Sequence, residues 1–465
     1  MTPTPIALDY TLRDLYALDN EAKCQPVLVY YRLPFEPHEA SLSVKFIYHS
    51  SMQAGDITWG AWAALDSKAV PQRYGFTAGQ MSLVMPDVDN PGHKRSPGAV
   101  PSGYVDAHRH DIHSNFARLR HDQQPNVRFA TNPDHITLEP GTLIAVAEPC
   151  DSMSHLPHLI DPEMHYEILS KRGLARSGLL TPPSTVIDPL LRPEDVHNSA
   201  QVQQEVARMT NFFDTYTIPF MVKLPQSFSG RGAFLVSSNA DRTRVKALLS
   251  VQLRGMLMQI NSANHHLYPC SLVLQDYTPG TEVALSLFVT PKGRPIFIAC
   301  CYQRFDEDGY WTGGSISYAD QAALEQLYTA TMEQVAQFLH RKGYHGPVGV
   351  DIITDRSGRQ YIVDLNARIT GTYHLGPLAG HFMQRGVGIA SVVTKYFSCS
   401  RAVFEEAFAY EIQQGCLIIT GWSHDKSMGL SYGAVTVGGR DTSEIERELR
   451  KVLAHAVAYA VSLHQ

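Results

Sequence analysis

Two apolar, β-branched runs separated by a turn signal constrain the fold of this chain more than any other segment. They form the stretch GVDIITDRSGRQYIVDLNARITG, residues 349–371. Ser357 and Gly358 carry the turn signal, so the two runs are predicted to pair as an antiparallel hairpin. In that register Asp351 lies directly opposite Asp364, with Cβ atoms about 5 Å apart.

Strand alternation gives the second run an acidic face. Ile362, Asp364, Asn366 and Arg368 are predicted to share that face, opposite an apolar one. Two facing carboxylates repel each other and favour their neutral forms unless a cation lies between them. Carboxylate and amide oxygens are ligands that Mg²⁺ takes while keeping waters and substrate phosphates. The pattern indicates a metal site at Asp351, Asp364 and Asn366, although a hairpin with a merely solvated polar face gives the same pattern.

A second segment, FMVKLPQSFSGRGAFLV, has the composition of an anion site. Lys223 ends an apolar strand, and Ser229, Gly230 and Gly232 follow in the loop before the next strand. Successive backbone N–H groups of a Gly/Ser loop form a concave anion site, and the lysine adds positive charge. No helix follows directly, so neither the GxxxxGK[ST] loop nor the Rossmann GxGxxG loop applies. An ordinary hairpin loop is the alternative.

A third segment, LVLQDYTPGTEVALS, is predicted to be a hinge between two lobes. An apolar strand ends at Gln275, Asp276 and Tyr277, turns at Thr278 and restarts at Glu282. Such a linker offers backbone C=O and N–H groups to a purine edge, and the following carboxylate can accept from ribose hydroxyls. A simple interdomain turn with a surface glutamate is the alternative.

In combination and in this order, the three segments resemble the ATP-grasp superfamily, which includes D-alanine ligases and biotin carboxylases. The resemblance covers about residues 161–371 and ends in G-x-D followed 13 residues later by D-x-N-x-R. It implies an α/β fold with four parts. These are an N-terminal α/β domain (1–157), linker helices with an α+β lid subdomain (158–275), a catalytic subdomain (276–395) and a small C-terminal α/β subdomain (396–465).

The resemblance also implies a role for each matching residue. The ATP-binding set is Lys223, Ser229, Gly230, Gly232, Gln275, Asp276, Tyr277, Thr278 and Glu282. The metal set, for Mg²⁺ with two ions bridging the phosphates and Mn²⁺ as a substitute, is Asp351, Asp364 and Asn366. The catalytic set is Arg368, Arg304 and Gly371. Many members carry a second phosphate-binding lysine, which stays unassigned here: Lys171, within a helix predicted from Pro162 to Arg176, stands too close to Gly178.

The implied reaction is an ADP-forming ligation. A substrate carboxylate attacks the γ-phosphorus of ATP to give an acyl phosphate, and an amine then attacks its carbonyl group to form an amide. Arg368 and N–H groups near Gly371 would stabilise the oxyanion, and Arg304 would contact the substrate. No biotin-carrier or CoA-binding segment is apparent. An amino-acid or peptide ligase of natural-product biosynthesis is therefore favoured, and the identities of the acid and the amine stay open.

The sequence also allows two other functions. The segment VDAHRHDIHSNF places His108, His110 and His113 in an HxHxxH run similar to the metal-binding opening of amidohydrolases. The repeated β/α pattern of such a barrel is not evident, so a loop, either solvated or lining the acceptor pocket, is expected there. A non-catalytic ATP-binding protein is the other alternative, and the complete set of polar residues on the hairpin argues against it.

Composition disfavours several other classes. A formal charge of -6 and the lack of a Lys/Arg run argue against nucleic-acid binding. The seven scattered cysteines contain no CxxC pair and are typical of reduced thiols. No apolar stretch approaches the roughly 18 residues of a membrane span, and the first residues lack signal-peptide features. We expect a cytoplasmic enzyme that acts on small molecules without nucleic-acid or membrane partners, and a homodimer stays open.

Overall fold

The N-terminal part is built on a small parallel sheet. The computed structural model describes residues 4–21, 25–30, 44–49, 57–87, 103–227, 232–305 and 311–457, with only the backbone of 57–64 and 103–107. Four strands in the order β3-β2-β1-β4 pair in parallel. The elements are α1 (Leu12–Ala17), β1 (Val27–Val29), α2 (Ile57–Gly75), β2 (Ser82–Pro86), α3 (Gly103–Phe116), β3 (Asn126–Ala130) and β4 (Ile144–Val146). β1, β2 and β4 are short and largely apolar, as buried parallel strands are. The edge strand β3 contains Asn126 and Arg128 and is mostly outside the core.

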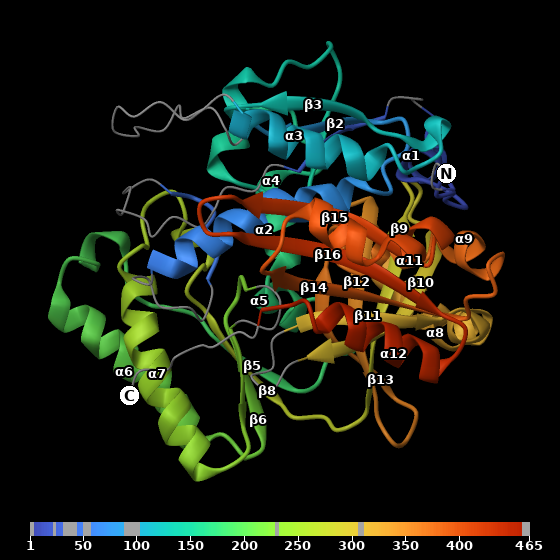
Figure 1. The fold of residues 1–465 in the computed structure, drawn as a ribbon. Helices are drawn as coiled ribbons and strands as arrows, with labels where there is room; N and C mark the ends of the chain where they lie inside the picture. The colour runs from blue at the N-terminus through green and yellow to red at the C-terminus, as the bar shows by residue number, and fades with distance from the viewer. Residues whose placement is uncertain are drawn as a thin grey trace.

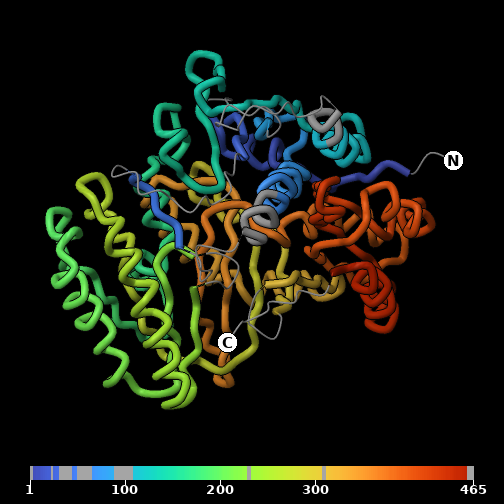
Figure 2. Tube along the Cα trace, turned by 60° about the vertical axis from the view of Figure 1, so that its left-hand side comes forward, coloured from blue at the N-terminus to red at the C-terminus, as the bar shows by residue number. Residues whose placement is uncertain are grey.

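A lid subdomain follows two short linker helices, and its core is its own. The helices are α4 (Pro162–Leu169) and α5 (Lys171–Ala175). The lid consists of β5 (Ser184–Ile187), α6 (Ser199–Thr215), β6 (Phe220–Lys223), β7 (Ala233–Val236), α7 (Asn239–Leu257) and β8 (Leu272–Asp276). Its antiparallel sheet has the order β5-β8-β6-β7, and apolar side chains of α6 and α7 pack against the strands. Figures 1 and 2 show this subdomain in green at one end of the molecule.

The remaining strands form one large antiparallel sheet in the order β13-β12-β9-β10-β11-β14-β16-β15. Its elements are β9 (Thr281–Val289), β10 (Pro295–Phe305), β11 (Trp311–Ser317), α8 (Gln321–Arg341), β12 (Gly346–Thr354), β13 (Gln360–Asn366), α9 (Ala379–Met383), β14 (Ile389–Phe397), α10 (Arg401–Ala407), α11 (Ala409–Gln414), β15 (Leu417–Asp425), β16 (Leu430–Gly439) and α12 (Thr442–Leu453). The N-terminal domain shares a core with one face of this sheet, and α8 covers the other face of β9 and β12. The predicted α/β class is confirmed.

The predicted hairpin exists as β12 and β13, and Asp351 pairs with Asp364. One detail of the prediction is wrong. The register shifts beside this pair, so that Ile352 pairs with Ile362 and Val363 becomes an additional residue in β13. A bulge of this kind reverses the alternation of side chains beyond it. Ile362 is therefore buried in the core beneath α8 and does not share the acidic face.

Candidate active site

Three acidic side chains share one face of the large sheet, opposite α8. Asp351 pairs with Ala284 on one side and with Asp364 on the other, and Glu282 follows on the same face of β9. Burial raises the pKa of Asp351 well above its usual value, and the charges of Asp364 and Glu282 raise it further. Burial also raises the pKa of Glu282. This face therefore concentrates negative charge that requires nearby cations.

Two lysines supply positive charge from outside the hairpin. Lys171 Nζ donates to Asp364 Oδ1 at 2.6 Å, and Lys223 Nζ donates to the Val363 carbonyl at 2.7 Å. Burial lowers the pKa of Lys223 to about 8, although Asp364 acts in the opposite direction. Burial alone would raise the pKa of Asp364. The positive charges of Lys171, Lys223 and Arg368 together hold it below the ordinary value.

Lys171, which the sequence analysis leaves unassigned, contacts the acidic pair. The single helix predicted from Pro162 to Arg176 is broken at Ser170, whose Oγ accepts from the Gly173 N–H at 2.7 Å and so caps a new helix. Lys171 is the first residue of that helix and contacts Asp364. A serine before a second helical run is a known start signal, and it was the available sign that the helix restarts there.

The bulge in β13 helps to place the other lysine. Because Val363 is the additional residue of the hairpin, it has no registered partner in β12, and its carbonyl accepts from Lys223 at the end of β6. Bulges are frequent next to active sites because they redirect groups away from the strand ladder. The lid sheet is thus linked to the large sheet by a charged side chain.

Asn366 and Arg368 continue the polar line as predicted. Asn366 Nδ2 donates to Asp364 Oδ2 at 3.4 Å, and Arg368 Nη2 donates to Asn366 Oδ1 at 3.3 Å. Arg368 Nη1 also donates to the Tyr74 hydroxyl at 3.0 Å, and Arg368 Nε lies 3.9 Å from Glu148. Arg368 therefore connects the hairpin to the N-terminal domain.

The predicted hinge joins two different sheets. β8 belongs to the lid sheet and β9 to the large sheet, so residues 277–280 link the two. Gln275 Nε2 donates to Ser184 Oγ at 3.0 Å, and Asp276 accepts from Tyr216 at 3.0 Å. Tyr277 is exposed and Thr278 is half-buried. The adenine and ribose roles of this segment stay predictions.

The predicted glycine-rich loop is described only in part. Ser229 and Gly230 lie outside the described residues. Gly232 has a φ of +83°, and a Cβ on it would stand 2.7 Å from the Ser227 Cβ. This position therefore requires glycine. The phosphate role of the loop stays a prediction.

Two residues of the predicted catalytic set lie differently from Arg368. Arg304 Nη2 donates to the Val392 carbonyl at 2.9 Å on β14. The neighbouring residue Gln303 lies on the acidic face, where it donates to Glu282 at 3.4 Å. Because side chains alternate along a strand, Arg304 points away from that face. Gly371 fits against Trp311, since a Cβ on it would stand 2.5 Å from the indole ring. The structure does not bring Arg304 to the acidic pair, and its substrate role stays a prediction.

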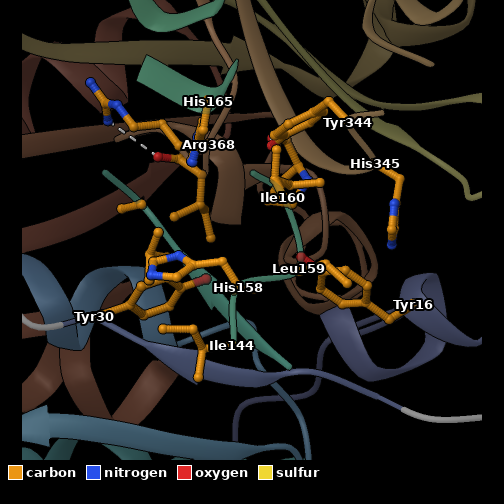
Figure 3. A pocket seen from close by; sticks show the side chains of 15 residues that line it. Tyr16, Tyr30, Ile144, His158, Leu159, Ile160, His165, Tyr344, His345 and Arg368 are labelled. Atoms are coloured by element: carbon orange, nitrogen blue, oxygen red, sulfur yellow. Dashed lines mark hydrogen bonds between the residues drawn. The ribbon is translucent and has the colours of Figure 1, made fainter. Parts of the chain in front are cut away.

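A pocket opens between Arg368 and the carboxyl ends of two parallel strands. Its lining includes Tyr30 just after β1, the three residues of β4 with Ala147 just after them, and also His158, His165 and Arg368. Figure 3 shows these side chains gathered around it. Ligands of open parallel sheets bind outside the carboxyl ends of the strands. The pocket is therefore a candidate substrate site next to the hairpin.

The histidine run lies on a helix, so the expectation of a loop is wrong. His108, His110 and His113 belong to α3, where residues two apart point in nearly opposite directions. Burial lowers the pKa of His108 to about 3. Within the described residues, no three His, Cys, Asp or Glu side chains come together to hold a metal ion. The amidohydrolase alternative is therefore not supported.

Comparison with known proteins identifies the class. Residues 237–372 match the family model of an ATP-grasp domain. The match includes the hinge and the hairpin and ends just beyond Arg368, whereas Lys171 and Lys223 precede it. The chain therefore contains an ATP-grasp domain, and the resemblance stated from its motifs is confirmed. No curated protein sequence matches the chain.

Similar solved structures include a synthetase and a ligase. N5-carboxyaminoimidazole ribonucleotide synthetase from Thermus thermophilus has 13% identity and a TM-score of 0.47, with 84% of this chain and 98% of that chain covered. Phosphoribosylamine–glycine ligase from Thermotoga maritima has 10% identity and a TM-score of 0.47, with 84% and 94% covered. At these values the similarity carries no argument about activity or substrate.

In the described residues, no helix is long and apolar enough to cross a membrane.

Proposed function

We propose that the chain is an ADP-forming carbon–nitrogen ligase, which activates a carboxylate with ATP and joins it to an amine. The observation that carries the proposal is the convergence of Lys171, Lys223, Asp351 and Asp364 where the lid meets the large sheet, inside and beside an ATP-grasp domain. Lysines that approach from separate segments can neutralise phosphate oxygens. The acidic pair can hold a divalent cation that neutralises the bound nucleotide.

The lysines are held in place before any nucleotide binds. Lys223 is almost fully buried, and among the described residues its ammonium group donates to the Val363 carbonyl and lies near carboxylates. A polyphosphate offers such a group stronger electrostatic partners than a carbonyl does. We assign Lys223 and Lys171 to the phosphates, Glu282 to the ribose, and the 275–278 segment to the adenine.

The hairpin residues fit a divalent cation of the Mg²⁺ type. Asp351, Asp364 and Asn366 present oxygen donors, and the Lys171 ammonium group already occupies a cation position at Asp364. When bound, Mg²⁺ would neutralise charge on the transferring phosphoryl group. The residues themselves orient the phosphates, and the raised pKa of Asp351 reflects the shortage of positive charge that a cation would relieve.

The carboxylate substrate is placed in the pocket beside Arg368. The guanidinium group lies at the end of the acidic line, where the carboxylate would meet the γ-phosphate, and its contacts with Tyr74 and Asn366 fix its orientation. Arg368 can then neutralise the acyl phosphate and the oxyanion formed when the amine attacks. We propose that the acid is an amino acid or a short peptide. We also propose that the closed site excludes water from the acyl phosphate.

The test is a matrix of amino acids offered in pairs, with ADP release as the first readout and mass spectrometry of the products as the second. Amide formation that requires ATP, Mg²⁺ and both partners is expected. Asp364→Asn should lower ADP release by at least about a hundredfold, because the cation that neutralises the bound nucleotide loses a carboxylate ligand. The matched surface variant Asp320→Asn, whose side chain makes no capping hydrogen bond at the start of α8, should behave as the natural chain does. Undiminished turnover by Asp364→Asn would contradict the site. Binding of MgADP without any turnover would favour the non-catalytic alternative.

A further inference from the structure

Arg73 on α2 is a buried cation that has no counter-ion among the described residues. The side chain is 6% exposed, and its Nε and Nη1 atoms have no hydrogen-bond partner among the described residues. The other buried arginine of the described residues, Arg401, is paired. Arg401, 7% exposed, lies 2.7 Å from Glu405 and donates to the Asp111 carbonyl at 2.8 Å. A buried charge without a partner lowers the stability of the folded chain.

The guanidinium group lies between two aromatic rings next to the reaction centre. Its central carbon is 5.6 Å from the ring centroid of Tyr74 and 5.6 Å from that of Trp311. The Tyr74 hydroxyl accepts from Arg368, and the Trp311 ring fills the space beside Gly371. Arg73 therefore contacts the hydrogen-bond partner of Arg368 and the ring that packs on Gly371, but it belongs to the N-terminal domain.

The groups around Arg73 do not neutralise it. His374 packs nearby, and its pKa is lowered to about 3, first by burial and then by the charge of Arg73, so the imidazole is neutral. Tyr432 also senses the charge of Arg73 and is hydrogen-bonded to Asp66, and its own pKa is raised by burial. The aromatic rings offer cation–π contacts, which do not use the N–H donors in the plane of the guanidinium group. Those donors remain available to an anion.

We propose that Arg73, held between Tyr74 and Trp311, is an anion subsite that binds a carboxylate group of the amine substrate. A planar guanidinium group matches a carboxylate with two parallel hydrogen bonds. Because Arg368 is assigned to the acid, the second arginine serves the other partner. The amine is therefore an amino acid or a peptide whose own carboxylate is recognised, and not a simple alkylamine. This identification of the amine rests on the proposed ligase function, whereas the anion subsite does not.

The subsite is tested first without turnover. Thermal unfolding midpoints are compared in sodium acetate, sodium phosphate and sodium chloride at equal ionic strength for the natural chain, Arg73→Met and Arg73→Lys. Acetate is expected to raise the midpoint of the natural chain by a few degrees relative to chloride, the Lys variant less, and the Met variant not at all. Arg401→Met, the control for a paired buried arginine, should keep the acetate response. A response to phosphate that exceeds the acetate response and is lost in Arg73→Met would overturn the carboxylate assignment.

The stability of the variant gives a second criterion. If Arg73 lacks a partner, Arg73→Met should unfold at the same temperature as the natural chain or higher, because it removes an uncompensated buried charge. A marked loss of stability, together with an acetate response equal to that of the natural chain, would show that Arg73 is structural and overturn the subsite.

The kinetic arm compares an accepted amino acid with its decarboxylated amine. Arg73→Met is expected to raise the KM for the amino acid by about tenfold to a hundredfold, the value of one charged hydrogen-bond pair, and to leave the KM for ATP unchanged. An equal preference for both amines in the natural chain would overturn the assignment to the amine. Binding of MgADP is measured in parallel. Its absence in the natural chain would defeat the ligase proposal alone, and the acetate response would still decide the subsite.

Discussion

Replacing Lys223 with methionine should stabilise the free protein while weakening nucleotide binding. The ammonium group is 9% exposed and bonded to one backbone carbonyl. Burial lowers its pKa to about 8 from the ordinary value of 10.5. Below pH 8 the folded chain therefore carries a charge that it holds less readily than the unfolded chain does.

The size of the effect follows from the pKa difference. A shift from 10.5 to about 8 corresponds to roughly 3 kcal/mol, since one pKa unit is worth about 1.4 kcal/mol. Methionine removes this penalty but loses the hydrogen bond to Val363, worth about 1 kcal/mol. The variant should gain about 2 kcal/mol at pH 7. The penalty is complete below pH 8 and disappears as the pH rises to 10.5, because only the unfolded chain then holds the additional proton.

The assay compares thermal unfolding midpoints of the natural chain and Lys223→Met at pH 7 and near pH 10. Taking the difference at each pH cancels the other groups that titrate in this range. The variant should unfold a few degrees higher at pH 7, and the advantage should vanish near pH 10. Lys246→Met on the lid surface, where the lysine is paired with Asp214 at 2.6 Å, should show no such gain. A Lys223→Met variant that is less stable at pH 7, with a difference that does not change with pH, would refute the reasoning.

Three further predictions concern the same region. Lys171→Met should raise the KM for ATP about tenfold or more, the value of one charged contact, in an ADP-release assay; an unchanged KM would remove Lys171 from the phosphate site. Because the pKa of Asp351 is raised, Mg²⁺ should displace a proton and bind more tightly as the pH rises through that pKa. Calorimetry in buffers of different ionisation enthalpy measures the proton, and its absence would contradict the shift. Gly371→Ala should cost about 1 to 3 kcal/mol of stability, since its Cβ would stand 2.5 Å from Trp311. Gly255→Ala, where a Cβ would meet nothing within 4 Å, should cause no such loss, and an equal loss at that position would disprove the packing argument.

The hairpin could be predicted because its information is local. A turn signal and two apolar runs set the Asp351–Asp364 pair, and the structure has that pair. The bulge at Val363 could not be predicted, since it depends on how β13 lies against β12 and on the core beneath α8. A single additional residue moved Ile362 to the other face, which period-two counting cannot anticipate.

Residues that act from outside the motifs were harder to find. The helix containing Lys171 was predicted as one element, and the cap at Ser170 that restarts it was not weighed. Arg73 occurs in an ordinary helical run, and only tertiary packing shows that it is buried without a partner. The run that contains His108 was expected in a loop because it follows a Pro/Gly-rich stretch, and it is helical instead.

The contacts of the two lysines bear on how the site would respond to a nucleotide. In the free protein, Lys171 neutralises Asp364 and Lys223 bonds to the bulge carbonyl. A bound triphosphate would compete for both ammonium groups and leave Asp364 without its cation. A divalent cation that binds with the nucleotide would again neutralise Asp364. Each of the two ligands therefore binds more tightly when the other is present. Nucleotide and metal should therefore bind cooperatively, and the Lys171→Met variant, which has no ammonium group to displace, should bind Mg²⁺ more tightly in the absence of nucleotide than the natural chain does.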